Sequence, residues 1–334
     1  MRIMIVGLGS IGRRHLRNLI SLGEEDFLLV RTGRSTLPDE ELVSYPSVKS
    51  VEEGLAWKPQ AVIVANPTAY HMEVALPAAK AGCHMLIEKP ISSSMDRIPA
   101  LVQAAASSGS RILVGFQYRF HPCLLRLHQL LSARELGEPV HARAHYGEYL
   151  PGWHPWEDYR RSYSSRSDLG GGALLTLCHP FDYLAWLFGP PTDIAARTAA
   201  LPHVELEGVE GIADVMLGFT GGTQATIHLD YAQRPAMQHL GVIGTEGSAE
   251  CDLLAGELRW WTAAEGEWRS FRVSEDFSRN DLFLAEMKHF LEIVQLGVAP
   301  VCGLAEGVLS LKAALAALES SRSRDTIHLE RIGS

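Results

Sequence analysis

Residues 1–22 read MRIMIVGLGSIGRRHLRNLISL. The apolar run from Met1 to Val6 predicts a β-strand, and the run from Arg13 to Leu22 is compatible with an α-helix. Between them, residues 7–12 form the pattern GxGxxG. A strand, this glycine pattern and a helix in direct succession are typical of a turn that binds a dinucleotide.

Each glycine of this pattern has its own role. Gly7 permits a tight turn, Gly9 lets the backbone approach a pyrophosphate, and Gly12 lets the helix pack closely on the strand. The helix begins with free N–H groups that bind anions, and we expect Ser10 and Ile11 to take part. Glycines with this spacing also occur in ordinary turns, so the prediction rests on their position directly after a strand.

The end of the second predicted strand, Phe27 to Val30, bears on the choice of cofactor. An acidic residue usually stands there when the ribose hydroxyls of NAD are bound, but this chain has Arg31, Thr32, Gly33 and Arg34. A guanidinium binds a 2′-phosphate through charge-assisted hydrogen bonds worth roughly 1.5–3 kcal/mol each. We therefore predict NADP(H) in preference to NAD(H). The alternative is that both arginines are solvated surface charges.

The composition excludes several classes of protein. A chain of 334 residues is longer than one hydrophobic core usually serves, so we expect two domains. The 30 Lys and Arg residues against 39 Asp and Glu residues give a net charge of −9. This balance argues against nucleic acid as a partner, because polyanions need a basic surface. No apolar run reaches about 18 residues, so we expect no membrane span.

The five cysteines are scattered and include no CxxC pair. An odd, scattered set suits reduced thiols in the cytoplasm better than a disulfide framework. The first strand begins at once, without the charged and apolar segments of a signal peptide. We expect a soluble cytoplasmic protein.

The first third of the chain alternates strands with helices, which predicts a doubly wound parallel sheet. The further strands expected are 61–65, 84–87 and 112–116, and the helices are 70–81 and 94–108. Residues that follow the carboxyl ends of such strands meet along one edge of the sheet, where ligands bind.

The remainder of the chain has a different rhythm. A helix is expected over 124–132, followed by strand-like runs that include 140–148, 211–219, 223–230 and 256–262. Turn signals such as Thr220-Gly221-Gly222-Thr223 indicate hairpins and an antiparallel sheet. Two helices are expected over 281–296 and 304–321. We place the domains at 1–120 and 121–334, with the last helix packing back on the first domain.

The tripeptide Glu88-Lys89-Pro90 follows the strand expected over 84–87. Pro90 favours an extended conformation for the residue before it, which restricts the backbone of Lys89. A lysine ammonium can donate a hydrogen bond to a substrate oxygen, and burial could lower its pKa enough for proton transfer. We expect Lys89 to be catalytic. The alternative is a surface lysine paired with Glu88.

A second group lies on a predicted helix that opens after Gly170-Gly171-Gly172 and runs to Phe188, with a kink at Pro180. Four side chains are three or four residues apart and would share one helix face. They are Thr176, His179, Asp182 and Tyr183.

Histidine titrates near neutral pH, so we expect His179 to act as a general acid or base. Asp182 could bind a sugar hydroxyl or orient the imidazole, and Thr176 could also contact substrate. The alternative is that His179 is a core histidine on an apolar helix.

These motifs together resemble the glucose-fructose oxidoreductase, inositol dehydrogenase and MocA family over nearly the whole chain. The resemblance rests on their joint order. The motifs are the GxGxxG, Asn66-Pro67-Thr68-Ala69-Tyr70-His71, Glu88-Lys89-Pro90, Phe116-Gln117-Tyr118-Arg119-Phe120 and the glycine-rich helix with its histidine.

The resemblance implies a Rossmann domain followed by an open-faced, mostly antiparallel sheet. It implies hydride transfer between nicotinamide and a hydroxyl or carbonyl carbon of a sugar, sugar acid, nucleotide sugar or polyol, with Lys89 and His179 handling the proton. It places Asn66, Pro67, His71, Glu88 and Arg119 around the cofactor. It also implies a homodimer or homotetramer assembled through the C-terminal sheet.

The chain departs from this family at one point. Many relatives carry an aspartate four residues before the histidine, where this chain has Leu175, followed by Thr176. Asp182 would have to replace that carboxylate, or the chemistry is altered. Two alternatives therefore stay open: a noncatalytic regulator that binds the cofactor as a sensor, and an NAD-dependent glycosidase with the same fold.

The substrate is predicted from the segment 148–161, which is rich in aromatic and arginine residues. We expect Tyr118, Trp153 and Tyr159 to contact a sugar ring, and the nearby arginines make an acidic or nucleotide-linked sugar plausible. Packing of the loop alone is the alternative. His141 and His145 alternate along one strand without a third ligand, so we predict no metal site.

Overall fold

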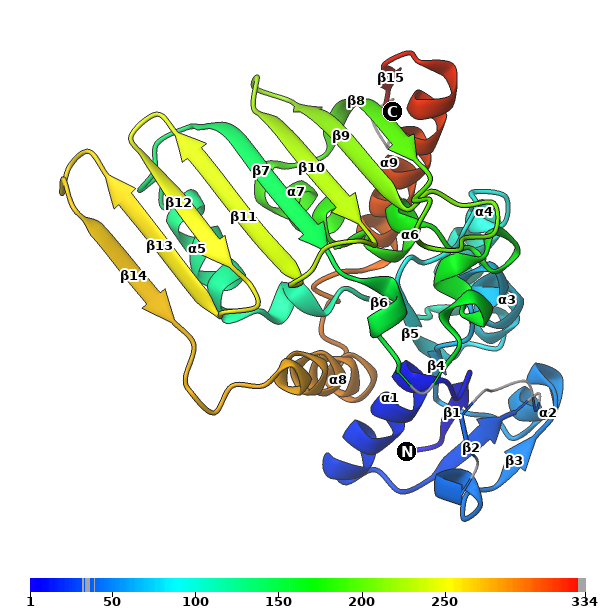
Figure 1. Cartoon of the computed structure of the whole chain (residues 1–334). Coiled ribbons are helices and arrows are strands. Elements are labelled where there is room, and N and C mark those ends of the chain that lie inside the picture. Colours follow the sequence, from blue (N-terminus) through cyan, green and yellow to red (C-terminus); the bar gives the residue numbers. More distant parts are fainter. Residues whose placement is uncertain (32, 34–36, 39, 156, 330–334) are drawn as a thin grey trace. The chain divides into compact units, whose positions relative to one another are not determined.

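The computed structural model describes residues 1–31, 33, 37–38, 40–155 and 157–329 (Figure 1). The chain divides into two compact units. Unit 1 comprises residues 1–117, 168–170 and 279–311, and unit 2 comprises residues 118–167, 171–278 and 312–334. Within the described ranges, no helix is long and apolar enough to cross a membrane.

Unit 1 contains a six-stranded parallel sheet of order β3-β2-β1-β4-β5-β6. Its central strands are short, apolar and fully buried, because helices cover both faces of such a sheet. The prediction of a doubly wound parallel sheet is confirmed. The strands are β1 Ile3–Val6, β2 Phe27–Val30, β3 Ser47–Val48, β4 Ala61–Val64, β5 His84–Glu88 and β6 Ile112–Gly115.

One helix of unit 1 comes from far along the sequence. Helix α8, Arg279–Leu296, packs against α1, Ser10–Ser21, and adds Met287, Phe290 and Ile293 to the core that contains Leu16. The range 121–334 expected for the second domain therefore includes a segment that completes the first. The other helices are α2 Val51–Ala56, α3 His71–Lys80 and α4 Ile98–Ser108, with short 3-10 turns at Glu40–Leu42 and Thr68–Tyr70.

Unit 2 contains a nine-stranded sheet of order β14-β13-β12-β11-β7-β10-β9-β8-β15. Its pairs are antiparallel except for β7 with β10 at the centre, which is parallel. The expectation of a mostly antiparallel second sheet is confirmed. The strands are β7 Pro139–Gly147, β8 Pro191–Ala199, β9 Ile212–Phe219, β10 Gln224–Asp230, β11 Met237–Gly244, β12 Gly247–Asp252, β13 Glu257–Thr262, β14 Trp268–Arg272 and β15 Ile327–His328.

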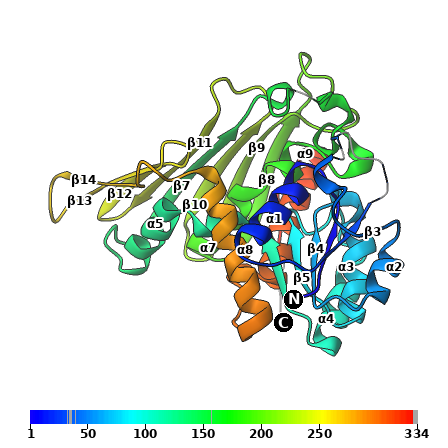
Figure 2. The same ribbon diagram turned by 90° about the horizontal axis from the view of Figure 1, so that it is seen from below.

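Helices cover only one face of this sheet. Figures 1 and 2 show α5, Pro122–Ser132, and α7, His179–Phe188, on the same face. Strand β10 alternates accordingly, with Ala225, Ile227 and Leu229 buried and the side chains between them partly exposed. Among the described residues of unit 2, no helix lies on the opposite face. Helix α9, Leu304–Ser323, spans both units, and its Ser320 Oγ accepts a hydrogen bond from the N–H of Ala196.

The hairpin expected at Thr220-Gly221-Gly222-Thr223 joins β9 to β10. Gly221 and Gly222 both have positive φ, 97° and 91°, which side chains with a Cβ rarely adopt. Local sequence therefore determined this turn.

The helix expected to continue to Phe188 with a kink is instead two helices, α6 at Ala173–Thr176 and α7. Pro180 has no N–H to donate to the carbonyl of Thr176, so the helical ladder stops there. Thr176 consequently does not share a helix face with His179 and Asp182, which is a correction to the prediction.

Candidate active site

In unit 1, three loops leave the carboxyl ends of neighbouring parallel strands. Residues 7–12 follow β1, Asn66 and Pro67 follow β4, and Lys89 and Pro90 follow β5. Because β1, β4 and β5 are adjacent and run the same way, their following residues lie along one edge of the sheet.

The glycine turn has the geometry that its pattern predicts. Gly7 has φ of 91°, and a Cβ at this position would lie 2.3 Å from the backbone nitrogen of Asn66. A Cβ at Gly12 would lie 1.8 Å from the carbonyl oxygen of Gly7. A Cβ at Gly9 would meet nothing within 4 Å. The turn is tight at two glycines and has open space at the third.

The start of α1 suits an anion. Its N-cap is Gly9, with no side-chain cap, and its first turn contains no acidic residue. Helix N-termini carry free N–H groups and a partial positive charge. Ser10 is exposed and Ile11 half-buried at this end, so the residues present fit the pyrophosphate of a dinucleotide.

The region beyond β2 is anchored by a buried arginine. Arg13 on α1 donates hydrogen bonds to the carbonyl oxygens of Leu8, at 2.9 Å, and Pro38, at 2.6 Å. Arg31 follows β2 directly, is half-buried, and its N–H donates to the carbonyl oxygen of Val48. Thr32 and Arg34, which were also expected at the cofactor, lie outside the described residues.

His71 links two of the three loops. One ring nitrogen lies 2.9 Å from the carbonyl oxygen of Asn66 and the other 3.0 Å from that of Pro90. The side-chain amide of Asn66 in turn donates to the carbonyl oxygen of Tyr70. Burial lowers the pKa of His71. The hydrogen bonds to these carbonyl groups and the charge of Glu88 raise the pKa, but by less than burial lowers it. The ring therefore holds the loops after β4 and β5 together.

The carboxylate of Glu88 has a partner that the sequence did not suggest. Its Oε1 lies 2.7 Å from Nε2 of His15 on α1, and both side chains are buried. Burial alone would raise the pKa of Glu88, but the hydrogen bond and charge of His15, together with the charges of Lys89 and His71, lower it overall. Lys89 is half-buried and precedes a cis peptide bond to Pro90.

In unit 2, His179 begins helix α7 and is buried among aromatic rings. The ring of Tyr118 packs edge-on against the imidazole, with 4.7 Å between the ring centroids. The ring of Tyr146 stacks on the imidazole, with 5.7 Å between the centroids. The Tyr118 hydroxyl donates to Oε1 of Gln238, whose amide donates to Glu148 at 2.5 Å. Tyr118 thus fixes the imidazole in place through packing.

Arg119 and Asp182 form a buried, bidentate ion pair. Nε and one terminal nitrogen of Arg119 each donate to a different carboxylate oxygen of Asp182, both at 2.8 Å. The guanidinium also lies 5.0 Å from the ring of Trp186. From the sequence, Arg119 was expected near the cofactor and Asp182 near the substrate. The structure gives each the other as a partner, so both oxygens of Asp182 already accept hydrogen bonds from Arg119.

Thr176 is buried at the end of α6, where its hydroxyl interacts with the phenol of Tyr231. Helix α6 begins after Gly172, whose φ of 103° side chains with a Cβ rarely adopt, and a Cβ there would also lie 2.6 Å from a carboxylate oxygen of Glu210. The Glu210 carboxylate accepts a hydrogen bond from the N–H of Leu174 at 2.8 Å and so caps this helix.

Several aromatic and arginine residues of the loop after β7 already have partners within unit 2. Trp153 packs edge-on against Tyr231 at 5.8 Å, and the Tyr159 hydroxyl accepts from the N–H of Glu205. Arg160 pairs with Asp158 at 2.8 Å, and Arg166 lies 3.8 Å from Glu207. Arg161 is exposed. Packing of the loop against other parts of unit 2, together with the pair Arg160 and Asp158, accounts for much of its composition.

Two family models match this chain. Residues 1–116 match the model described as an oxidoreductase family with an NAD-binding Rossmann fold, and residues 124–250 match that of the GFO/IDH/MocA C-terminal domain. The chain belongs to the Gfo/Idh/MocA family. The resemblance inferred from the motifs is thereby confirmed.

Curated members of the Gfo/Idh/MocA family align over the whole chain. A scyllo-inositol 2-dehydrogenase (NAD(+)) from Bacillus subtilis is 25% identical, covering 99% of this chain and 96% of that protein. A D-xylose 1-dehydrogenase (NADP(+)) from Haloferax volcanii is also 25% identical, covering 99% and 100%. This protein therefore has sugar and polyol dehydrogenases as homologues, and they differ in the nicotinamide nucleotide that they use.

Solved structures of low identity show the same fold. A levoglucosan dehydrogenase in complex with NADH and levoglucosan has a TM-score of 0.86 at 17% identity, covering 99% of this chain and all of the other. The WlbA dehydrogenase from Bordetella pertussis, in complex with NADH and UDP-GlcNAcA, has a TM-score of 0.81 at 20% identity, with 99% of both chains covered. The expected Gfo/Idh/MocA architecture is thus confirmed.

Sequence reasoning missed several residues that support the Gfo/Idh/MocA site. His15, Tyr146 and Gln238 contact Glu88, His179 and Tyr118 respectively. Each lies far from its partner in sequence, 73 residues for His15 and 120 for Gln238, so no local spacing could identify it. The cofactor and substrate roles predicted for individual residues stay predictions.

Proposed function

We propose that this protein is an NAD(P)-dependent dehydrogenase or reductase of a sugar, sugar acid, nucleotide sugar or polyol. The observation that carries the proposal is Lys89 at the carboxyl end of β5, on the sheet edge that also holds the glycine turn. The names of the aligned relatives, an inositol dehydrogenase and a xylose dehydrogenase, support the class of substrate.

The bound nicotinamide would supply the hydride acceptor or donor, and residues of this chain would supply the proton chemistry. The ammonium of Lys89 is proposed to donate a hydrogen bond to the reacting oxygen of the substrate. The imidazole of His179 is proposed to take up or release the proton, held in orientation by Tyr118 and Tyr146. His71 and Asn66 are proposed to keep the loops around the cofactor in position.

Replacement of the lysine tests this assignment. Lys89→Met keeps the length of the side chain but removes the ammonium, so turnover should fall by roughly 10²–10⁴-fold while cofactor affinity changes little. Turnover is measured by absorbance of the reduced cofactor with a panel of sugars, acidic sugars, nucleotide sugars and polyols, and affinity by tryptophan fluorescence.

Lys80→Met, at the last turn of α3, is the matched control and should retain full activity. Unchanged turnover in Lys89→Met would contradict the catalytic role. Cofactor binding by the unmodified protein without turnover of any compound would instead support the sensor hypothesis. Release of a glycoside product without accumulation of reduced cofactor would support the glycosidase hypothesis.

We also propose that NADP(H) is bound in preference to NAD(H), on the ground that Arg31 stands where NAD-binding domains usually carry an acid. Arg31→Ala should weaken NADPH binding by roughly tenfold to a hundredfold and leave NADH binding nearly unchanged. Side-by-side fluorescence titrations measure both constants. The exposed Arg97 serves as the control site for substitution. Equal affinities of the unmodified protein for the two cofactors would overturn this preference.

A further inference from the structure

We propose that the open face of the nine-stranded sheet binds one divalent metal ion of the zinc type, held by His145, His228 and Asp230. All three belong to unit 2, and neither the proposed catalytic residues nor the cofactor turn takes part. The prediction of no metal rested on His141 and His145 lacking a third ligand. The structure supplies two further ligands from the neighbouring strand.

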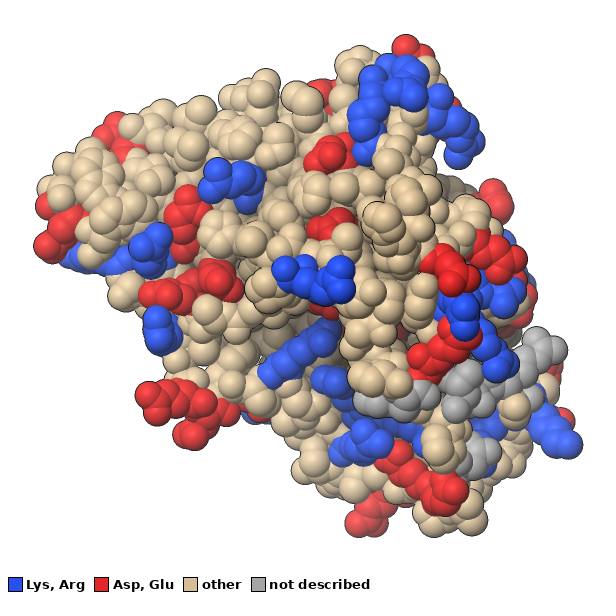
Figure 3. Space-filling model, viewed as in Figure 1, with Lys and Arg blue, Asp and Glu red and all other residues tan. Residues whose placement is uncertain are grey.

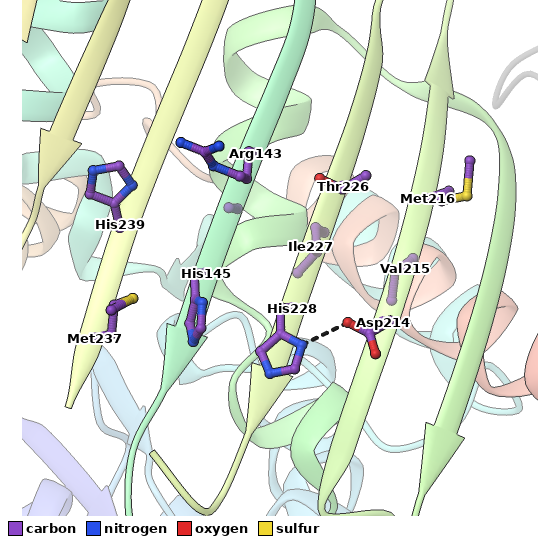
Figure 4. A pocket seen from close by; sticks show the side chains of 11 residues that line it. Arg143, His145, Asp214, Val215, Met216, Thr226, Ile227, His228, Met237 and His239 are labelled. Atoms are coloured by element: carbon purple, nitrogen blue, oxygen red, sulfur yellow. Dashed lines mark hydrogen bonds and ion pairs between the residues drawn. The ribbon is translucent and has the colours of Figure 1, made fainter. Parts of the chain in front are cut away.

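The parallel pairing of β7 with β10 brings these residues together. The register places His145 directly opposite His228. Side chains on a strand alternate between faces, so Asp230, two residues after His228, lies on the same side. Figure 4 shows His239, His145 and His228 side by side on β11, β7 and β10, with Asp214 on β9.

The three ligand atoms lie slightly farther apart than a bound metal ion requires. Oδ2 of Asp230 lies 3.5 Å from Nε2 of His228 and 3.7 Å from Nε2 of His145. All three atoms lie within 4.8 Å of one another. A tetrahedral zinc ion bound at about 2.0–2.1 Å holds its ligand atoms roughly 3.3 Å apart. Small side-chain movements would therefore complete the site.

The atoms that would not touch the metal already have partners. Nδ1 of His228 lies 2.6 Å from Oδ1 of Asp214, an arrangement that leaves the Nε2 lone pair for a metal. Oδ1 of Asp230 accepts the N–H groups of Ala232, at 2.7 Å, and Gln233, at 2.6 Å. Metal-binding histidines are commonly oriented by such a second carboxylate.

Asp230 provides an independent indication of a ligand. Its side chain is only 4% exposed, and the two imidazoles that face Oδ2, at 3.5 and 3.7 Å, are too distant for a well-formed hydrogen bond. A buried carboxylate oxygen without such a bond is costly unless a cation compensates it. Asp230 and Asp214 raise the pKa of His228 to about 9, so the imidazolium of His228 is that cation until a metal ion displaces its proton. The oxygen faces both histidines, which is where the proposed ion would lie.

The surroundings leave room for a cation and a further ligand. A hollow open to solvent is lined by Met216, Thr226 and Met237 beside the histidines. In the view of Figure 3, few Lys or Arg side chains lie over the centre of this sheet. The nearby Arg143 is exposed and lies 3.4 Å from Glu250. Three protein ligands leave a fourth position for water or a small anion.

Metal titration of the whole protein tests the proposal without using enzyme activity. The EDTA-treated full-length chain is titrated with Zn²⁺ by calorimetry, and with Co²⁺, whose visible spectrum reports its coordination. We expect one site per chain and the spectrum of a four-coordinate ion. His145→Gln, His228→Gln and Asp230→Asn should each lower the affinity at least about tenfold, and Asp214→Asn by roughly 10- to 100-fold.

His141→Gln is the matched control, since His141 lies on the same strand and face but outside the group. It should leave the Zn²⁺ affinity unchanged. Circular dichroism shows whether each variant remains folded. The proposal is overturned if Zn²⁺ does not bind at one equivalent, or if His141→Gln weakens binding as much as His228→Gln does. It is also overturned if Asp214→Asn leaves the Zn²⁺ affinity unchanged, because the proposal requires Asp214 to orient the imidazole of His228 towards the metal.

Discussion

At the scale of single residues, two buried polar side chains have partners that the sequence did not suggest. The two oxygens of Asp182 accept hydrogen bonds from Arg119, and the ring of His179 is held by Tyr118 and Tyr146. The proton chemistry proposed for His179 therefore depends on an aromatic environment, without the carboxylate that many relatives place four residues earlier.

One buried acid in unit 1 should make the stability of the protein depend on pH. Glu286 on α8 is 1% exposed, and neither carboxylate oxygen has a hydrogen-bond partner among the described residues. Burial raises the pKa of Glu286 well above its usual value, and the charge of Glu88 raises it further. The folded protein thus keeps a proton that the unfolded chain loses near the ordinary pKa of glutamate. Stability contributed by this group is full below that ordinary pKa and falls as pH rises towards the folded value.

Glu286→Gln should remove this loss, since glutamine resembles the protonated acid. The variant should gain free energy of unfolding relative to the unmodified protein as pH rises, by at most roughly 1.4 kcal/mol per pH unit. Urea unfolding at about pH 5 and about pH 8 measures the change. Glu292→Gln, at a more exposed site on the same helix, should show little such dependence. An equal effect of Glu286→Gln at both pH values would contradict the argument.

At the scale of elements, we expect two glycines of the turn between β1 and α1 to have different roles, Gly12 in stability and Gly9 in cofactor binding. Gly12→Ala places a Cβ against the carbonyl oxygen of Gly7, so backbone must move. We expect this variant to lose about 1–3 kcal/mol of stability.

In Gly9→Ala, the added Cβ meets no atom within 4 Å, and Gly9 has φ of −74°, which alanine adopts readily. We expect it to unfold at the same temperature as the unmodified protein but to bind NADPH and NADH at least about tenfold more weakly, because the Cβ enters the space of the pyrophosphate.

Thermal unfolding and fluorescence titration of the two variants measure these effects. If Gly9→Ala bound both cofactors normally, the pyrophosphate would not approach the turn at this glycine. If Gly12→Ala were as stable as the unmodified protein, the close approach of helix and strand would not be needed.

The elements that the sequence predicted well have strong local patterns. The glycine turn, the alternation of strands and helices up to β6, and the hairpin at Gly221 and Gly222 depend on backbone sterics and on short apolar runs. The prediction of one long helix up to Phe188 was wrong, because Pro180 interrupts the helix and does not merely kink it. The edge strands β3 and β15 are only two residues long, too short for any periodic pattern.

At the scale of the whole molecule, the chain combines a parallel sheet covered on both faces with a larger sheet covered by helices on one. Assembly of copies through the larger sheet stays a prediction. Its open face also carries the proposed metal site, so measurements of oligomeric state with and without Zn²⁺ would show whether the two properties are linked.

The sequence by itself determined the dinucleotide turn, the position of Lys89 after a strand, the two kinds of sheet and membership of the family. These features depend on neighbouring residues, whose conformations follow from local sterics and apolar periodicity. The tertiary structure alone decided the return of α8 to the first core, the pairing of Arg119 with Asp182, and the meeting of His145 with His228 and Asp230. Those contacts join residues tens to hundreds of positions apart, and they follow from strand register and burial of the folded chain, which no local pattern encodes.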